Sequence, residues 1–397
     1  MSRHQKIIIV GGGFGGVRTA VRLANKEGFW VRLISPKSYF EYHAALYRSA
    51  TGRSPLEVAI PLEEFFQSAK NIEVVEDTIV SLDAKEQTLS GQSGSEYEYD
   101  HVIFAMGTVP NYYGIPGLDR YSFGLKTVQD AVSLREHLHE QLVTHDHDHT
   151  YAVIGGGASG VELAGALVGY ERKIRQAHHV KNEFSVDIIE AAPQVVGMLG
   201  DRFSRLVTKR LQSLGVRVMA NTCAEKETLN ELKLKHTSIH SHTVVWTAGQ
   251  ATHPFFSQYP DVFTFSKKGR VKVDDYLRAA KHIFVIGDCA DTLYSGMAQT
   301  AIHDANFVSN YLLRKYWDWS IVKYKAKKPA YVIPVGQRWA AVKWGAFETY
   351  GYLGWMIRRL ADLRLFLMLL PLRYAFAAWH YGNVHEESCS ICRVEKV

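Results

Sequence analysis

Two glycine-rich turns are the parts of this chain with the clearest chemical meaning. The first, in "KIIIVGGGFGG", places Gly11, Gly13 and Gly16 after a run of β-branched residues and before a helix-like stretch at 17–26. In such a turn the first glycine makes the bend, the second lets the backbone approach a pyrophosphate, and the third allows close packing of helix on strand. The amides at the helix start then hold the phosphates. We therefore expect a dinucleotide to bind here.

The same arrangement returns in the middle of the chain. The stretch "YAVIGGGASGVELAGAL" contains Gly155, Gly157 and Gly160, and the following strand "SVDIIE" ends in Glu190. A carboxylate at this point accepts hydrogen bonds from a ribose 2′-hydroxyl and repels a 2′-phosphate. The spacing to Glu190 is longer than usual, and we assign the extra residues to a basic helix around "YERKIRQAHH". The sequence therefore predicts a second dinucleotide site that prefers NADH to NADPH.

Further strands are needed to position these two turns. Apolar strands followed by small residues occur at 99–111 and 242–254, where they would close each half of the chain, and "HIFVIGDCAD" presents Gly287 and Asp288 after another apolar strand. Alternating strands and helices of this kind predict parallel sheets in an α/β fold. Two dinucleotides in one chain suggest a tightly bound flavin beside an exchanging nicotinamide.

Residues 6–315 resemble the type II NADH:quinone oxidoreductases, a family of flavoproteins with two dinucleotide-binding domains. The resemblance rests on both glycine turns and on "ALYRSATG", "AMGTVPNYYGIPGL", "GVELAGAL", "IEAAP", "VVWTAG", "IFVIGDCA" and "AQTA". It implies two Rossmann-like domains in a glutathione-reductase-like arrangement. FAD, tightly bound without a covalent bond, would occupy residues 1–112 and 264–315, and NADH would bind to residues 113–263. Residues 316–397 would form a C-terminal amphipathic region at the membrane surface.

The resemblance also implies roles for single residues. Asp288 would bind the ribityl chain of FAD, and Glu162 would reach toward the nicotinamide and flavin rings. A quinone would be reduced beside Gln299 and His303, although His303 and Asp304 replace two glutamines of the family's pattern. A histidine there could donate a hydrogen bond or a proton to a quinone oxygen. The other cofactor-binding residues implied are Gly11, Gly13, Phe14, Gly16, Ser35, Lys37, Gly107, Gly287 and Ala298 for FAD, and Gly155, Gly157, Gly160, Glu190 and Gly249 for NADH.

Several of these residues have a plainer alternative. Glu162 could be an acid in the first turns of a helix, stabilised by the helix dipole. Asp288 could cap a turn or a helix. His303 could simply be packed in its helix.

Two other functions stay open at this point. Sulfide:quinone oxidoreductases resemble this family but need two cysteines flanking the flavin, whereas only Cys289 is expected near it and Cys223 falls in the nicotinamide half. We expect Cys389 and Cys392 to lie in a reduced tail. An NADH-bound flavoprotein could instead serve as a redox-gated binding or signalling module. The tract "THDHDHT" at 144–150 is predicted to be a solvated linker, and no metal site is expected.

The C-terminal stretch at 355–382 combines arginines, leucines and aromatic residues. In a helix, Met356 and Leu360 would share one face, with Arg358 opposite, and Pro371 would end or kink the helix. The arginines exclude a membrane-spanning helix. An ordinary amphipathic helix packed on a core is one alternative, but the tryptophans, tyrosines and basic residues of this region favour the bilayer surface.

Composition adds expectations about location and partners. The chain has 46 Lys and Arg residues against 40 Asp and Glu, a net charge that does not require nucleic acid, and we expect no nucleic-acid partner. An apolar strand beginning at residue 6 leaves no room for a long leader. We therefore expect a monotopic protein on the cytoplasmic face of the cell membrane, with a membrane quinone as partner and without proton pumping. A homodimer is left open.

Overall fold

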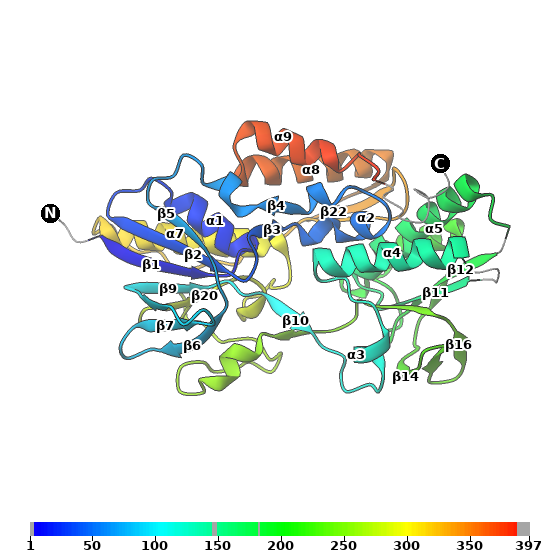
Figure 1. Ribbon diagram of the computed structural model, residues 1–397, viewed down its shortest axis with the longest axis horizontal. Helices are drawn as coiled ribbons and strands as arrows, with labels where there is room; N and C mark the ends of the chain where they lie inside the picture. The colour runs from blue at the N-terminus through cyan, green and yellow to red at the C-terminus, as the bar shows by residue number, and fades with distance from the viewer. Residues whose placement is uncertain (1–3, 145–148, 182, 387–397) are drawn as a thin grey trace.

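Two sheets, parallel except for the edge strand β19, form the two lobes of the molecule (Figure 1). The structure is a computed structural model that describes residues 4–144, 149–181 and 183–386. The first sheet has the strand order β19-β20-β9-β1-β2-β5, and the second has the order β13-β12-β11-β17. The strands of the first sheet are β1 (Gln5–Val10), β2 (Phe29–Ser35), β5 (Ile72–Glu76), β9 (His101–Phe104), β19 (Arg278–Ala280) and β20 (Ile283–Val285). Those of the second are β11 (His149–Ile154), β12 (Phe184–Ile189), β13 (Val216–Met219) and β17 (Thr243–Trp246).

Each sheet is covered on both faces, which explains the unbroken apolar runs in its central strands. In the first lobe, α1 and α7 pack together on one face, and a small sheet of β6, β7 and β8 covers the other. In the second lobe, α5 and α6 lie on one face and β14, β15 and β16 on the other. The longer helices are α1 (Phe14–Leu23), α4 (Val128–Thr144), α5 (Ala158–His178), α6 (Asp201–Leu214), α7 (Ala298–Tyr316), α8 (Tyr352–Leu369) and α9 (Leu372–Tyr381).

Short elements complete the two lobes and connect them. The connection itself is made by β10 and β18, which pair antiparallel. The short strands are β3 (Tyr39–Glu41), β4 (Ala59–Pro61), β6 (Ile79–Asp83), β7 (Thr88–Gly91), β8 (Glu96–Glu98), β10 (Thr108–Pro110), β14 (Ala224–Glu227), β15 (Glu231–Leu234), β16 (Ser238–His240) and β18 (Gln250–Thr252). The short helices are α2 (Leu46–Ala50), α3 (Leu118–Tyr121), η1 (His43–Ala45), η2 (Pro55–Glu57), η3 (Leu62–Phe65), η4 (Gly197–Leu199), η5 (Pro254–Gln258) and η6 (Gly287–Cys289).

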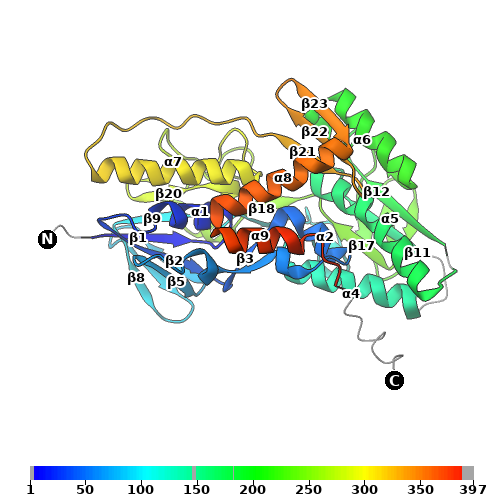
Figure 2. The same cartoon turned by 90° about the horizontal axis from the view of Figure 1, so that it is seen from above.

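The C-terminal region adds a third layer. Three antiparallel strands, β21 (Tyr331–Pro334), β22 (Ala340–Trp344) and β23 (Phe347–Gly351), lead into α8. The helices α8 and α9 pack against each other over the region where the two lobes meet (Figures 1 and 2). Pro371 separates the two helices, as predicted. The three-stranded sheet was not predicted.

The first half of helix α8 turns its charges inward and several apolar side chains outward. Arg358, Arg359 and Asp362 are buried, whereas Met356 and Leu360 are 44% and 58% exposed. Leu365, Phe366 and Leu369 of α8 are buried in the core as well, so the helix has one side packed on the protein and an apolar strip that faces outward. No helix within the described residues is long and apolar enough to cross a membrane.

Candidate active site

The two glycine turns have the same construction. Gly11 and Gly155 adopt φ angles of +115° and +112°, a region that favours glycine. A side chain at Gly16 would bring its Cβ to 1.9 Å from the carbonyl oxygen of Gly11, and Gly160 has the same relation to Gly155. Both α1 and α5 can therefore begin close against the strand that precedes them.

One cavity of about 1060 Å³ joins the two turns. Gly13 and Gly157 line it, and a Cβ at either position would meet no atom within 4 Å, so each turn presents open backbone to the cavity. Thirteen of the residues selected from the sequence line this space: Gly11, Gly13, Phe14, Ser35, Lys37, Gly107, Gly157, Glu162, Glu190, Gly287, Asp288, Ala298 and Gln299. Gly16, Gly155, Gly160 and Gly249 occupy close-packed positions outside the lining.

In the first lobe, the cavity is lined by the N-terminal end of a helix and by charged side chains with bonded partners. Asp288 accepts a hydrogen bond from the Gly296 amide at 3.1 Å, and Lys37 forms an ion pair with Glu41 at 2.7 Å. The first residue of α7, Ala298, also lines the cavity. The positive end of that helix dipole therefore faces whatever is bound here, and it favours a group that gains negative charge.

In the second lobe, the cavity is lined by Glu190, the residue that directly follows β12. Its Oε2 accepts a hydrogen bond from the Gly156 amide at 2.6 Å, and its Oε1 accepts one from the Ala192 amide at 2.7 Å. The second glycine turn and this carboxylate are thus fastened together. A phosphate held by the turn would place its ribose close to Glu190.

Glu162 lies on α5, the helix that begins at the second glycine turn. Its side chain is buried and lines the cavity. Burial raises the pKa of Glu162 to about 7, although the guanidinium groups of Arg358 and Arg48 oppose the shift. Close to neutral pH the carboxyl group can therefore either hold or release a proton.

His43 and Lys126 are among the titratable residues that line the cavity and were missed in the sequence. Burial, reinforced by the charge of Lys126, lowers the pKa of His43 to about 4, so its ring is neutral at pH 7. Burial also lowers the pKa of Lys126, whose ammonium group donates a hydrogen bond to the Thr108 hydroxyl at 3.0 Å. Neither residue belongs to a motif that marks it in the sequence.

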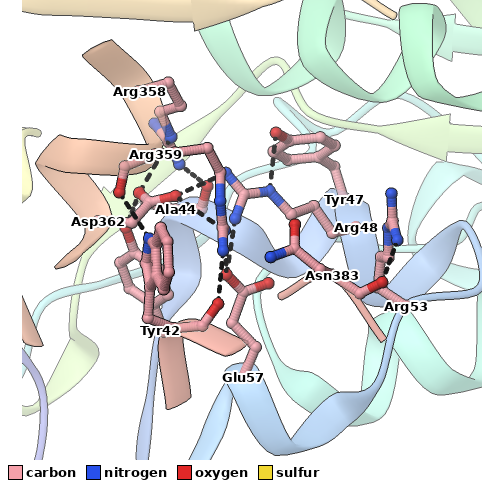
Figure 3. Close-up of polar contacts among 11 residues, drawn as sticks. Tyr42, Ala44, Tyr47, Arg48, Arg53, Glu57, Arg358, Arg359, Asp362 and Asn383 are labelled. Carbon is pink, nitrogen blue, oxygen red and sulfur yellow. Dashed lines mark hydrogen bonds and ion pairs between the residues drawn. The ribbon is translucent and has the colours of Figure 1, made fainter. Parts of the chain in front are cut away.

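Helix α8 forms a further wall of the cavity, through Arg358, Ala361, Asp362 and Leu365. Figure 3 shows how this wall is tied to the first lobe. Arg48 forms ion pairs with Asp362 at 2.7 Å and with Glu57 at 2.6 Å. Arg358 lies 3.1 Å from Asp362 and donates a hydrogen bond to the carbonyl oxygen of Ala44.

The charges of this wall and of the residues paired with it behind the cavity lining do not cancel by themselves. Three buried guanidinium groups, those of Arg48, Arg358 and Arg359, face two carboxylates, Glu57 and Asp362. Ionised Glu162 would be the third carboxylate. When Glu162 holds a proton, this side of the cavity keeps an excess positive charge that favours a bound anion.

His303 lies apart from the other residues selected from the sequence. It does not line the cavity, and its half-buried ring is bonded to the carbonyl oxygen of Lys325 at 2.8 Å. The side-chain amide of Gln299 is bonded to the backbone of Ala330. Asp304 is buried beneath them and bonds to Gly287 and to a tyrosine of the segment that follows α7.

The described cysteines lie outside the cavity lining. Cys289 is buried, with its thiol directed to the carbonyl oxygen of Ile286, and Cys223 is exposed. Cys389 and Cys392 lie outside the described residues, as do residues 145–148 of the histidine-rich tract. Within the described parts of the chain, no group of three His, Cys, Asp or Glu side chains could hold a metal ion.

Two glycine turns that open into one cavity define a protein with paired dinucleotide sites. The chain belongs to the pyridine nucleotide-disulphide oxidoreductase family, whose sequence model matches residues 5–305. The predicted α/β fold with two Rossmann-like domains is thereby confirmed.

Known relatives narrow the comparison. The chain is 26% identical over 387 residues to a type II NADH:quinone oxidoreductase of Mycobacterium tuberculosis, covering 89% of this chain and 83% of that protein. It is also 26% identical over 314 residues to the type II NADH:quinone oxidoreductase of Staphylococcus epidermidis, covering 74% of this chain and 76% of the relative. The resemblance to this family that the sequence motifs indicated is confirmed.

Solved structures agree on the fold. NDH2 from Plasmodium falciparum in complex with NADH superposes with a TM-score of 0.83 at 17% identity, covering 96% of this chain and 98% of the other. The sulfide:quinone oxidoreductase of Aquifex aeolicus gives a TM-score of 0.78 at 18% identity, covering 96% and 93%. Because one fold serves both enzymes, the choice of substrate has to be argued from the site.

Proposed function

We propose that this chain is an FAD-dependent NADH:quinone oxidoreductase of type II that works at a membrane surface and does not pump protons. The observation that carries the proposal is the single cavity that joins both glycine turns and ends against α8. Substrate and acceptor can then meet one flavin from different sides. The names of the relatives from Mycobacterium tuberculosis and Staphylococcus epidermidis support quinone as the acceptor.

We infer that this cavity takes two dinucleotides. In the first lobe Gly11, Gly13, Ser35 and Asp288 would hold FAD, and in the second lobe Gly157 and Glu190 would hold NADH. The open space over both turns leaves room for the two pyrophosphates. When bound, the flavin supplies the ability to accept a hydride from NADH and to pass on two electrons. We keep the division into 1–112 with 264–315, 113–263 and 316–397 as a proposal.

The chain's own groups would position the reactants and move a proton. The start of α7 would favour negative charge on the ring system beside it. Glu162, with its pKa near 7, would hold a proton within the cavity and release it to an acceptor oxygen that gains electrons. Arg358 would limit the cost of leaving Glu162 ionised afterwards.

The outward apolar face of the C-terminal helices supports a membrane surface on this side of the molecule. Leu353, Met356, Leu360 and Leu367 of α8 are exposed, together with Leu372 and Phe376 of α9. Large exposed apolar patches of this kind mark binding surfaces. A quinone could then reach the cavity from the lipid past α8, while NADH arrives from water. We place this surface on the cytoplasmic face, where NADH is found.

Replacing two residues of this face, Met356→Asp with Leu360→Asp, is expected to lower binding to lipid vesicles by at least tenfold. Burying each such side chain contributes about 1.5–3 kcal/mol, and tenfold in affinity is about 1.4 kcal/mol. Co-sedimentation with vesicles of phosphatidylglycerol and phosphatidylcholine would measure the change. Leu229→Asp is the matched control, because Leu229 is 69% exposed between β14 and β15, and β14 lies away from α8 in Figure 1. Equal loss in both variants would contradict the assignment.

Replacing Glu190 should weaken the choice between the two nicotinamide cofactors. In Glu190→Ser, kcat/KM for NADH is expected to fall and that for NADPH to rise, so that their ratio drops by at least about tenfold, since the carboxylate no longer accepts from the 2′-hydroxyl or repels a 2′-phosphate. Steady-state rates with both cofactors measure the ratio. An unchanged ratio would remove Glu190 from the nicotinamide site.

The function as a whole is tested by the choice of donor and acceptor. With FAD-loaded protein, NADH oxidation should depend on added short-chain quinone, and sulfide should not replace NADH. Quinone reduction by sulfide would favour the sulfide oxidoreductase reading, which the burial of Cys289 and the exposure of Cys223 disfavour. NADH binding without quinone-dependent turnover would favour a redox-gated binding module.

A further inference from the structure

We propose that Gln299, His303 and Asp304 act by fastening an extended strap, residues 317–330, along α7. The strap connects α7 to β21 and runs beside α7 in Figure 2. In this proposal Gln299 and His303 are positioning residues that influence the acceptor through the strap. The kinetic part of the inference rests on the proposed function, whereas the structural part does not.

Three side chains on α7 bond to the strap's backbone, those of Gln299, His303 and Arg314, and the Arg314 guanidinium donates to the carbonyl oxygen of Ser320 at 2.7 Å. The amide of Gln299 donates to the carbonyl oxygen of Ala330 at 2.9 Å and accepts from the Ala330 amide at 3.1 Å. The Nε2 of His303 lies 2.8 Å from the carbonyl oxygen of Lys325. Because a carbonyl oxygen can only accept, the His303 ring must donate at Nε2. The N–H group at Nε2 of His303 is therefore already used in a hydrogen bond outside the cavity.

The buried side chain of Asp304 also holds the strap on α7. The hydroxyl of Tyr324 donates to Asp304 Oδ1 at 2.7 Å, and the amide of Gly287 donates to Asp304 Oδ2 at 3.0 Å. Gly287 belongs to η6, whose next residue, Asp288, lines the cavity. One buried carboxyl group therefore joins the strap to the floor of the cavity.

The end of the strap forms part of the cavity wall. Ala330 lines the cavity together with Tyr331, Val332 and Ile333 of β21. Holding the strap on α7 therefore sets the position of this wall, which faces the same space as α8. This arrangement accounts for His303 in place of a glutamine, because either side chain can donate to the carbonyl oxygen of Lys325.

Limited digestion with trypsin tests whether these side chains hold the strap on α7, without any assumption about function. The strap contains three exposed lysines after which trypsin can cleave, Lys323, Lys325 and Lys327. In His303→Ala we expect cleavage within the strap to be roughly threefold to tenfold faster, as expected when one hydrogen bond is lost from a locally opening segment. His303→Gln should keep the wild-type rate. The control His236→Ala removes an exposed histidine between β15 and β16 and should change nothing.

Kinetics separate a positioning role from direct contact with the acceptor. In His303→Ala the KM for a short-chain quinone should rise by about threefold to tenfold, while the rate of flavin bleaching by NADH stays unchanged, and His303→Gln should restore the KM. Unaltered digestion of His303→Ala, or His303→Gln behaving like His303→Ala in both assays, would overturn the proposal. If wild-type protein fails to reduce quinone, the proposed function fails. The digestion rates would still show whether His303 holds the strap on α7.

Discussion

Replacing Glu162 by glutamine should lower the rate at which quinone reoxidises the reduced protein by about 10²-fold at pH 6. General acid–base groups typically contribute about 10²–10⁴-fold, and glutamine keeps the shape of the side chain while removing its proton. Burial raises the pKa of Glu162 to about 7, so the group carries its proton below pH 7 and loses it above. The wild-type rate should therefore fall as pH rises through 7, and the Glu162→Gln rate should be flat there. Stopped-flow absorbance at several pH values measures both.

A matched control lies on the same helix. Glu171 is also a buried glutamate of α5, and burial raises its pKa to about 8, but it does not line the cavity. Glu171→Gln should leave quinone reoxidation within about twofold of wild type. A pH dependence near 7 that survives in Glu162→Gln would show that another group carries the proton.

Replacing Asp362 by alanine should have the largest effect on stability. Removing one partner of a buried ion pair costs about 3–5 kcal/mol, because the remaining charges stay buried without compensation. Asp362 is in contact with Arg48 and Arg358 and accepts a hydrogen bond from Tyr42. Urea denaturation followed by fluorescence measures the free energy of unfolding. Because the same contacts hold α8 against the first lobe, vesicle binding should also weaken.

An exposed ion pair provides the comparison for this prediction. Glu73 pairs with Arg32 at 2.7 Å, and its side chain is 40% exposed, so Glu73→Ala should cost no more than about 1 kcal/mol. Although burial acts in the opposite direction, Arg358 and Arg48 hold the pKa of Asp362 below its ordinary value. The stability that Asp362 provides is therefore present above the unfolded pKa, and it is lost when the pH falls through the folded one. A loss of less than 1 kcal/mol in Asp362→Ala would contradict the structural role of this network.

The local parts of the site could be predicted because their requirements are local. A glycine at 11 or 155 is needed by the backbone angle at that residue, and the strand and helix on either side are visible in the adjoining apolar pattern. The carboxylate at 190 follows from the same logic, since it ends the next strand of the sheet. Such features leave a mark within about 30 residues of sequence.

The cavity wall that α8 forms could not be predicted from local sequence patterns. Arg48 and Asp362 are 314 residues apart, and their pairing arises only when α8 packs on the first lobe. Periodicity correctly separated Met356 and Leu360 from Arg358, but it could not tell which face would be buried. His303 was selected because of its position in a family pattern, and the folded strap gave it a partner that no pattern could indicate.

The most direct test of the central claim is anaerobic stopped-flow mixing of the FAD-loaded protein, first with NADH and then with a short-chain quinone. If the chain is a type II NADH:quinone oxidoreductase, the flavin absorbance should bleach within the time of one turnover and return as fast when quinone is added. A reduced complex with NADH that persists in the presence of quinone would contradict the account and favour a binding or signalling role.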